Sequence, residues 1–210
     1  MSKYTFEDLV EVANANPTIF NRFPGTLDGK QLTPPSERLV KLIEKALEVT
    51  FPEDYRRVIS KWGYLALGKD CGFFGLWGDD PRVFLDEPFN VFQETAIARD
   101  SMGLPKNCVV IWSDPGEGVD YGVIDTTTGK VLSYDRYDKD SYEEVSDSFV
   151  DCVFQELTLH RRANEIIYGA PFQWPESVQE KVAEDMLRLK EPLDEYDELF
   201  DRFEETVKNA

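Results

Sequence analysis

The histidine content limits the chemistry open to this chain more than any other feature of its sequence. His160 is the only histidine, and it lies on the apolar stripe of a predicted helix, beside Arg161 and Arg162. A histidine in that position is typical of a structural residue near a helix end. Serine or cysteine hydrolase chemistry would require His160 itself to meet a nucleophile, and HExxH or multi-histidine metal sites are excluded.

The glycines around position 118 do not form a nucleotide-binding loop. Gly116, Gly118 and Gly122 have the spacing GxGxxxG, and the segment leads into a predicted strand. A dinucleotide loop instead has the spacing GxGxxG and opens a helix whose N-terminus holds the phosphates. The sequence therefore predicts no bound cofactor.

A run of acidic residues resembles a calcium loop in charge alone. Its members are Asp135, Asp138, Asp140, Glu143 and Glu144. The central glycine and terminal glutamate of an EF-hand are both misplaced here, so we predict no metal centre, with an adventitious cation site as the alternative.

Glycoside hydrolysis by a pair of carboxylates stays an alternative, because the 41 acidic residues offer many pairs. No acid stands out as one held in an apolar pocket with a raised pKa, and we therefore expect no enzyme activity.

The cysteines Cys71, Cys108 and Cys152 are far apart and form no CxxC pair. We interpret them as reduced core residues rather than disulfide or zinc ligands.

The net charge is −18, with a pI of about 4.4. Nucleic acid and anionic membranes are disfavoured as ligands because both are held by Lys and Arg, so a basic protein partner is favoured. The charge is uneven: residues 114–151 contain eleven acidic and three basic residues, and residues 175–210 contain twelve and five. Solubility alone is the simpler explanation of acidity, but this concentration favours a binding surface.

No apolar stretch approaches the roughly 20 residues that cross a bilayer. The first 20 residues are acidic and lack the basic and apolar regions of a signal peptide. We therefore expect a cytoplasmic protein.

Hydrophobic periodicity predicts helices over residues 6–15, 34–47, 52–62, 87–101 and 141–162, and two more in 175–207 that Pro192 separates. The helix over 87–101 is predicted to bury Phe89, Phe92, Ala96 and Ile97. A strand pair is predicted between residues 64 and 83. The runs CVVIW (108–112) and VLSYD (131–135) and the alternating run YGVID (121–125), joined by Gly-containing turns, predict a three-stranded antiparallel meander.

This order predicts an α+β fold with an antiparallel sheet packed with helices, plus a C-terminal helical hairpin. We divide the chain into an N-terminal arm (1–34), an α+β domain (35–165) and a C-terminal helical extension (166–210).

Several phrases of the sequence resemble the SUKH superfamily of Smi/Knr-like proteins. They are LVKLIEKALEVTFPEDYRRVISKWG (39–63), LPKNCVVIWSDPGEG (104–118), DYGVIDTTTGKVLSYD (120–135) and SFVDCV (148–153). The resemblance covers residues 35–162 and departs from the pattern at Gly63, which stands alone where many relatives carry paired glycines. It implies a binding role: bacterial members are typically immunity proteins of polymorphic toxin and contact-dependent inhibition systems, whose toxins are often nucleases. Eukaryotic relatives are cell-wall and signalling regulators.

The leading hypothesis is a non-catalytic immunity protein that binds and neutralises a basic toxin domain. A regulatory scaffold of the same fold is the second hypothesis, and an enzyme using buried carboxylates is the third. We predict that the partner binds the acidic meander and its turns, because turns on a rigid sheet present side chains at little cost to the fold. The predicted residues are Asp79, Asp80, Asp114, Glu117, Asp120, Tyr121, Asp135, Tyr137, Asp138 and Asp140.

Overall fold

The computed structural model describes residues 2–20, 33–67, 72–79, 90–113, 120–135, 142–168 and 171–189. Its helices are α1 (Phe6–Ala15), α2 (Pro17–Phe20), α3 (Glu37–Leu47), α4 (Glu53–Trp62), α6 (Val91–Met102), α7 (Phe149–Tyr168) and α8 (Glu176–Arg188). Its strands are β1 (Leu65–Ala66), β2 (Gly72–Phe73), β3 (Cys108–Ser113), β4 (Asp120–Asp125), β5 (Val131–Asp135) and β6 (Tyr142–Ser146). The predicted α+β fold is confirmed.

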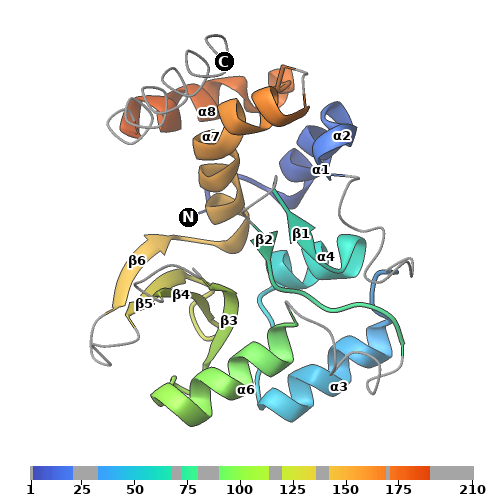
Figure 1. Cartoon of the computed structure of the whole chain (residues 1–210), viewed down its shortest axis with the longest axis vertical. Helices are drawn as coiled ribbons and strands as arrows, with labels where there is room; N and C mark the ends of the chain where they lie inside the picture. The colour runs from blue at the N-terminus through green and yellow to red at the C-terminus, as the bar shows by residue number, and fades with distance from the viewer. Residues whose placement is uncertain are drawn as a thin grey trace, which may run out of the picture.

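The larger sheet has the order β3-β4-β5-β6, and all of its neighbouring strands are antiparallel. Strands β3 to β5 confirm the predicted meander, and β1 with β2 confirms the predicted strand pair. Helix α6 lies against β3, while α7 starts beyond β6 and runs away from the sheet toward α1, α2 and α8 (Figure 1). The sheet therefore presents its β6 side next to the α7–α8 helices.

The prediction of a helix beginning at Ser141 is wrong. Residues 142–146 form strand β6, and α7 begins at Phe149 and continues to Tyr168, beyond the predicted end at residue 162. Ser141 and Glu144 have the spacing of a capping box, which is a local preference. Pairing with β5 overrides it, and the side chain of Ser148 accepts the backbone N–H of Asp151 at 3.1 Å instead.

Helix α6 buries a different face from the one predicted. Its buried residues are Val91, Thr95, Ala98 and Met102; Ala96 and Ile97 are exposed, Phe92 is half-buried, and Phe89 lies outside the described residues. The hydroxyl of Thr95 accepts a hydrogen bond from the backbone N–H of Val110 at 3.0 Å, so a polar residue occupies the core face of α6 and binds the backbone of β3. A count of apolar residues misses such a face.

The helices on the other side of the molecule follow local sequence signals. Pro52 and Gly63 flank α4, as predicted, while α3 begins after Ser36 rather than at Pro34. The backbone N–H of Leu76 donates to the carbonyl of Gly63 at 2.9 Å, which ties the end of α4 to the segment after β2. A Cβ atom at Gly75 would overlap the Gly63 carbonyl, so only glycine fits there.

The N-terminal segment belongs to the hydrophobic core. Tyr4, Leu9 and Val12 are buried in one cluster with Val153 of α7 and Val178 of α8. The division at residues 34 and 165 stays a prediction, and the buried cluster extends across both positions. Helix α8 confirms the first helix of the predicted C-terminal pair; the second, over 196–207, lies outside the described residues.

Candidate partner-binding surface

Two of the three predicted acidic residues that the structure describes lie at strand ends of the larger sheet. Asp120 opens β4 and Asp135 ends β5, and their Cα atoms are direct partners in the ladder. Asp79 is exposed after Gly78, whereas Tyr121 is only 8% exposed and belongs to the core. The remaining predicted residues lie outside the described part of the chain: Asp80, Asp114, Glu117, Tyr137, Asp138 and Asp140. The role of this set in binding stays a prediction.

Strand β6 adds acidic residues that the sequence reasoning had placed on a helix. Glu143 and Glu144 are exposed, and Tyr142 is 52% exposed with its ring stacked on that of Tyr134 at 5.9 Å between centroids. The only strand signals in YEEVS are Tyr142 and Val145, which are too few to outweigh a capping pattern without knowledge of β5.

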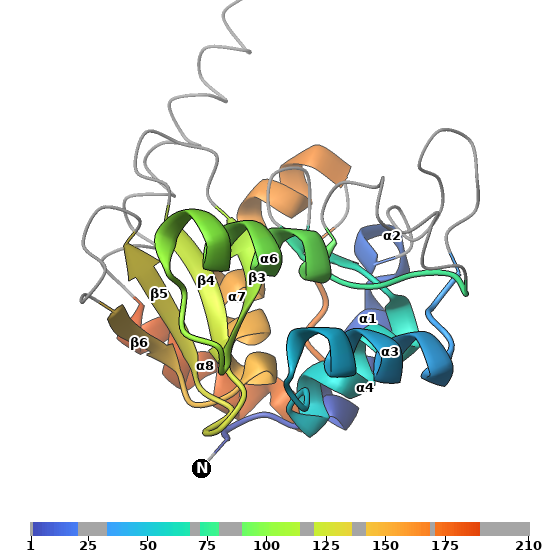
Figure 2. The same cartoon turned by 90° about the horizontal axis from the view of Figure 1, so that it is seen from below.

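The β6 strand is one of the two edge strands of the sheet. It is the outermost strand in Figures 1 and 2, and no other strand among the described residues pairs with it besides β5. At the opposite edge, the N–H of Phe74 donates to the carbonyl of Ile111 in β3 at 2.6 Å, so another segment of the chain already pairs with part of β3. An uncovered strand edge presents backbone N–H and C=O groups that can pair with another chain.

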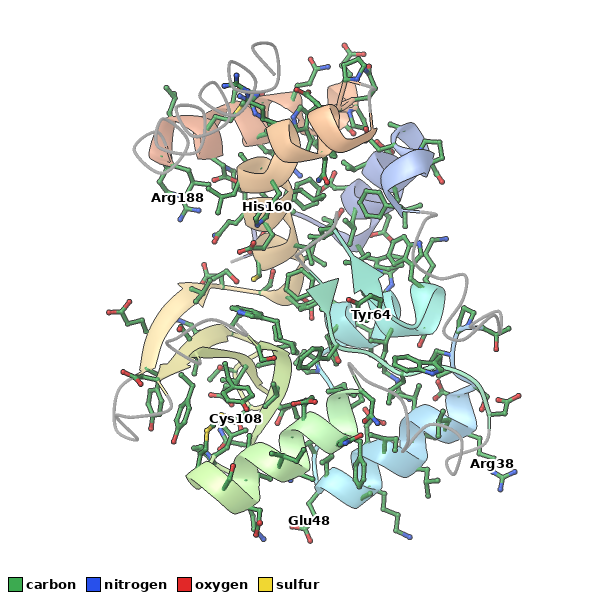
Figure 3. The ribbon with its side chains drawn as sticks, viewed as in Figure 1. Arg38, Glu48, Tyr64, Cys108, His160 and Arg188 are labelled. Atoms are coloured by element: carbon green, nitrogen blue, oxygen red, sulfur yellow. The ribbon has the colours of Figure 1, made fainter. Side chains whose placement is uncertain are left out.

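A hollow of about 470 Å³ adjoins the end of β6. Figure 3 shows Arg188 extending from the end of α8 on the side of β6. The lining has four acidic and two basic side chains, a local balance of −2, and it comprises Lys3, Tyr4, Glu144, Val145, Ser146, Asp147, Asp151, Gln155, Asp185 and Arg188. The acidic character of the edge therefore continues into the hollow.

The floor of the hollow is an internally paired polar network. The phenol of Tyr4 donates to Asp185 at 2.5 Å, and the ammonium of Lys3 lies 2.9 Å from the other oxygen of the same carboxylate. Burial, followed by the hydrogen bond to Asp185, raises the pKa of Tyr4. Asp151 accepts the backbone N–H groups of Lys3 at 2.9 Å and Tyr4 at 2.8 Å. These contacts fix residues 2–4 between α7 and α8.

The rim of the hollow is more open than its floor. The side chains of Glu144 and Asp147 are 50% and 49% exposed, and the ammonium of Lys130 lies 2.6 Å from the first and 3.9 Å from the second. These carboxylates face solvent and can respond to an incoming cation.

Catalytic chemistry finds little support in the described residues. His160 lies within α7 rather than at its end, and its ring is 3.3 Å from Glu156. Burial raises the pKa of Cys108 to about 11, which keeps its thiol protonated near neutral pH. Cys108 and Cys152 are buried in the core, as predicted, and Cys71 lies outside the described residues. No group of three His, Cys, Asp or Glu side chains in the described segments is placed to hold a metal ion.

Burial raises the pKa of two described acids, Asp54 and Glu94, as is expected of a catalytic acid, and Asp54 has backbone hydrogen-bond partners. Its carboxylate accepts the backbone N–H groups of Tyr55 at 2.8 Å and Val150 at 3.2 Å. Those bonds cap the start of α7 and join it to α4, so the geometry gives Asp54 a structural role.

A protein-family model described as SMI1-KNR4 cell-wall, of the SUKH group, matches residues 6–158. The chain belongs to the SUKH family. The match begins at the first residue of α1, so the family domain includes a helix that the motif resemblance over 35–162 leaves out. A comparison of this SUKH chain with curated proteins finds no match. In the described part of the chain, no helix combines the length and apolarity that a membrane span requires.

Proposed function

We propose that this SUKH protein is a non-catalytic immunity protein that binds and neutralises a basic toxin domain. Membership of the family fits a non-catalytic immunity or regulatory module. The observation that carries the proposal is the location of the negative charge: residues 114–151, with eleven acidic and three basic residues, include β4, β5 and β6. Five of these acidic residues lie on three consecutive strands of one sheet: Asp120 and Asp125 in β4, Asp135 in β5, and Glu143 and Glu144 in β6.

A concentrated negative surface acts on a basic partner before contact. It attracts that partner over about 8–10 Å at physiological ionic strength and raises the association rate. Toxins that act on nucleic acids need Lys and Arg to hold phosphates, and an acidic protein that covers those residues blocks the substrate. A cytoplasmic location, where such a toxin acts, is part of the proposal.

Charge reversal at the meander tests this function. A triple variant carrying Asp135→Lys, Asp138→Lys and Asp140→Lys is expected to associate about tenfold more slowly at low salt with a basic toxin domain encoded beside the gene. The matched control reverses Asp100, Glu176 and Glu180, which are exposed residues of α6 and α8, and it changes the net charge equally. Equal association rates for the two variants, or rates independent of salt, would refute a binding role for the meander.

A regulatory scaffold is the second candidate, and the family description SMI1-KNR4 cell-wall favours it. A toxin reading frame beside the gene, together with protection of cells that express both proteins, supports immunity. If cells that express both proteins at the same levels are not protected from the toxin, the regulatory scaffold is supported instead. Reproducible turnover of any substrate that disappears with Asp54→Asn, while the variant stays folded, would contradict both binding roles.

A further inference from the structure

We propose that the edge of β6, which has no strand neighbour other than β5 in the described part of the chain, binds an extended, basic segment of the partner by strand addition. A lysine or arginine of that segment would be directed toward the adjoining hollow. The inference rests on the proposed function, since it describes how the basic partner is held. It starts from the topology: β6 ends the β3-β4-β5-β6 order, and β5 is its one strand neighbour among the described residues. Added strands gain affinity from main-chain hydrogen bonds and specificity from alternate side chains.

The charge along β6 determines the kind of occupant. Residues 142–147 have the sequence YEEVSD, which contains three acidic residues and no basic one. Pairing with β6 of a second copy would bring these acids together between two chains that each carry a net charge of −18. Like charges on paired strands are destabilising, whereas a basic strand gains from the same positions. The edge is therefore complementary to a Lys- or Arg-rich segment.

The side chains of β6 suit an alternating basic strand. Residues two apart in a strand share a face, so Tyr142 and Glu144 project to the same side. Tyr142 is 52% exposed, and the Glu144 side chain is 50% exposed. A carboxylate beside an accessible aromatic ring favours Lys or Arg, which gains both an ion pair and a cation–π contact.

The hollow lies at the end of the β6 edge. Glu144, Val145 and Ser146 of β6 line it together with Asp147, so it opens where the strand edge runs toward α7. Its volume of about 470 Å³ and its four acidic against two basic side chains suit a long cationic side chain. Lys3 and Tyr4 already satisfy the buried floor carboxylates Asp151 and Asp185. The guest cation is therefore expected to meet the half-exposed rim acids Glu144 and Asp147, which it would share with Lys130.

A peptide titration of the full chain tests the inference. The probe is a short synthetic peptide of alternating lysine and threonine, compared with the same peptide N-methylated at every second amide. Methylation removes main-chain donors from one edge and leaves the charge unchanged. At low salt, the unmodified peptide is expected to shift the amide resonances of residues 142–146 saturably, and the methylated peptide to bind about tenfold more weakly.

Protein variants locate the contact. Glu144→Gln is expected to weaken peptide binding about fivefold, since it removes one exposed carboxylate without changing shape, while Asp100→Asn on α6 is expected to leave binding unchanged. Equal binding of the two peptides would show attraction by charge alone and overturn strand addition. Shifts confined to residues outside β6, or an unmodified peptide that fails to bind, would overturn it equally.

Sedimentation of the free protein distinguishes the second possible occupant. A dimer that the peptide dissociates would show that β6 pairs with its own copy and would overturn the choice of a basic segment. The toxin association and protection assays are independent of these peptides. If the protein protects cells from the toxin but binds the two peptides equally, only the strand-addition inference fails. If it does not protect cells but still prefers the unmodified peptide, the proposed immunity function fails.

Discussion

Replacing Asp151 with alanine is expected to release the N-terminal segment from α7 and destabilise the whole domain. One carboxylate oxygen of Asp151 accepts two backbone N–H groups, those of Lys3 and Tyr4, at 2.9 and 2.8 Å. Asp151 itself is 6% exposed. In the alanine variant the Tyr4 N–H is left buried without an acceptor, while water can reach the partly exposed Lys3 N–H.

The expected loss follows from these donors. A hydrogen bond to a charged acceptor contributes about 1.5–3 kcal/mol, and an unsatisfied buried donor costs a similar amount. Counting Tyr4 N–H in full and Lys3 N–H in part gives a loss of about 2–4 kcal/mol in the free energy of unfolding. For a chain of this size the melting temperature should fall by about 5–15 °C. Tyr4 stacks on Phe154 with 3.8 Å between ring centroids, so freeing the segment also loosens that contact.

Urea unfolding followed by circular dichroism, with amide hydrogen exchange at Tyr4, measures both effects. Asp151→Asn retains an acceptor oxygen and is expected to lose about 1 kcal/mol. Glu180→Ala removes the same charge from an exposed site on α8 and should change stability by less than about 0.5 kcal/mol. A loss below about 1 kcal/mol for Asp151→Ala, or unchanged exchange at Tyr4, would refute the claim that this carboxylate anchors the N-terminus.

Further predictions concern backbone fit, thiol chemistry and the C-terminal helices. Gly75→Ala should lower the free energy of unfolding by at least about 3 kcal/mol, because its Cβ overlaps the Gly63 carbonyl. Gly78 has a φ of 74° and open space around it, so Gly78→Ala should lower it by about 1 kcal/mol. Equal losses in urea unfolding would contradict this. At pH 8 about one thousandth of Cys108 is thiolate, given its pKa of about 11. Mass spectrometry should therefore find it alkylated about a hundredfold more slowly in the folded than in the unfolded protein, and rapid labelling of folded protein would contradict its burial. Deleting residues 175–210 removes the buried side chains of α8 and should lower the melting temperature; an unchanged value with lost binding would assign these helices to the partner instead.

Much of the fold could be predicted because its signals are local. Helix α4 lies between Pro52 and Gly63, and both flanks are visible in the sequence. The strands β3 to β5 are β-branched and aromatic runs that Gly-containing turn sequences separate, so pattern and pairing agree. The acidic content of residues 114–151 is likewise a property of the sequence alone.

The candidate site was predicted only in part because its arrangement depends on distant residues. Asp120 and Asp135 were predicted at the turns of the meander, where the structure places them. The hollow was not predicted, since it brings together Lys3, Glu144 and Asp185 from three separate parts of the chain. Tyr121 was named as a partner contact, and only the sheet's packing makes it a core residue.

The sequence by itself determined the family, the α+β class and the absence of histidine-based catalytic patterns, and its net charge is the basis for predicting a basic partner. These depend on composition and on patterns within a few turns or strands. Only the tertiary structure decided that residues 142–146 form an edge strand, because the hydrogen bonds that β5 offers outweigh the local capping pattern. It also decided that Thr95 faces the core, since the N–H of Val110 in β3 supplies the donor that makes a buried hydroxyl stable.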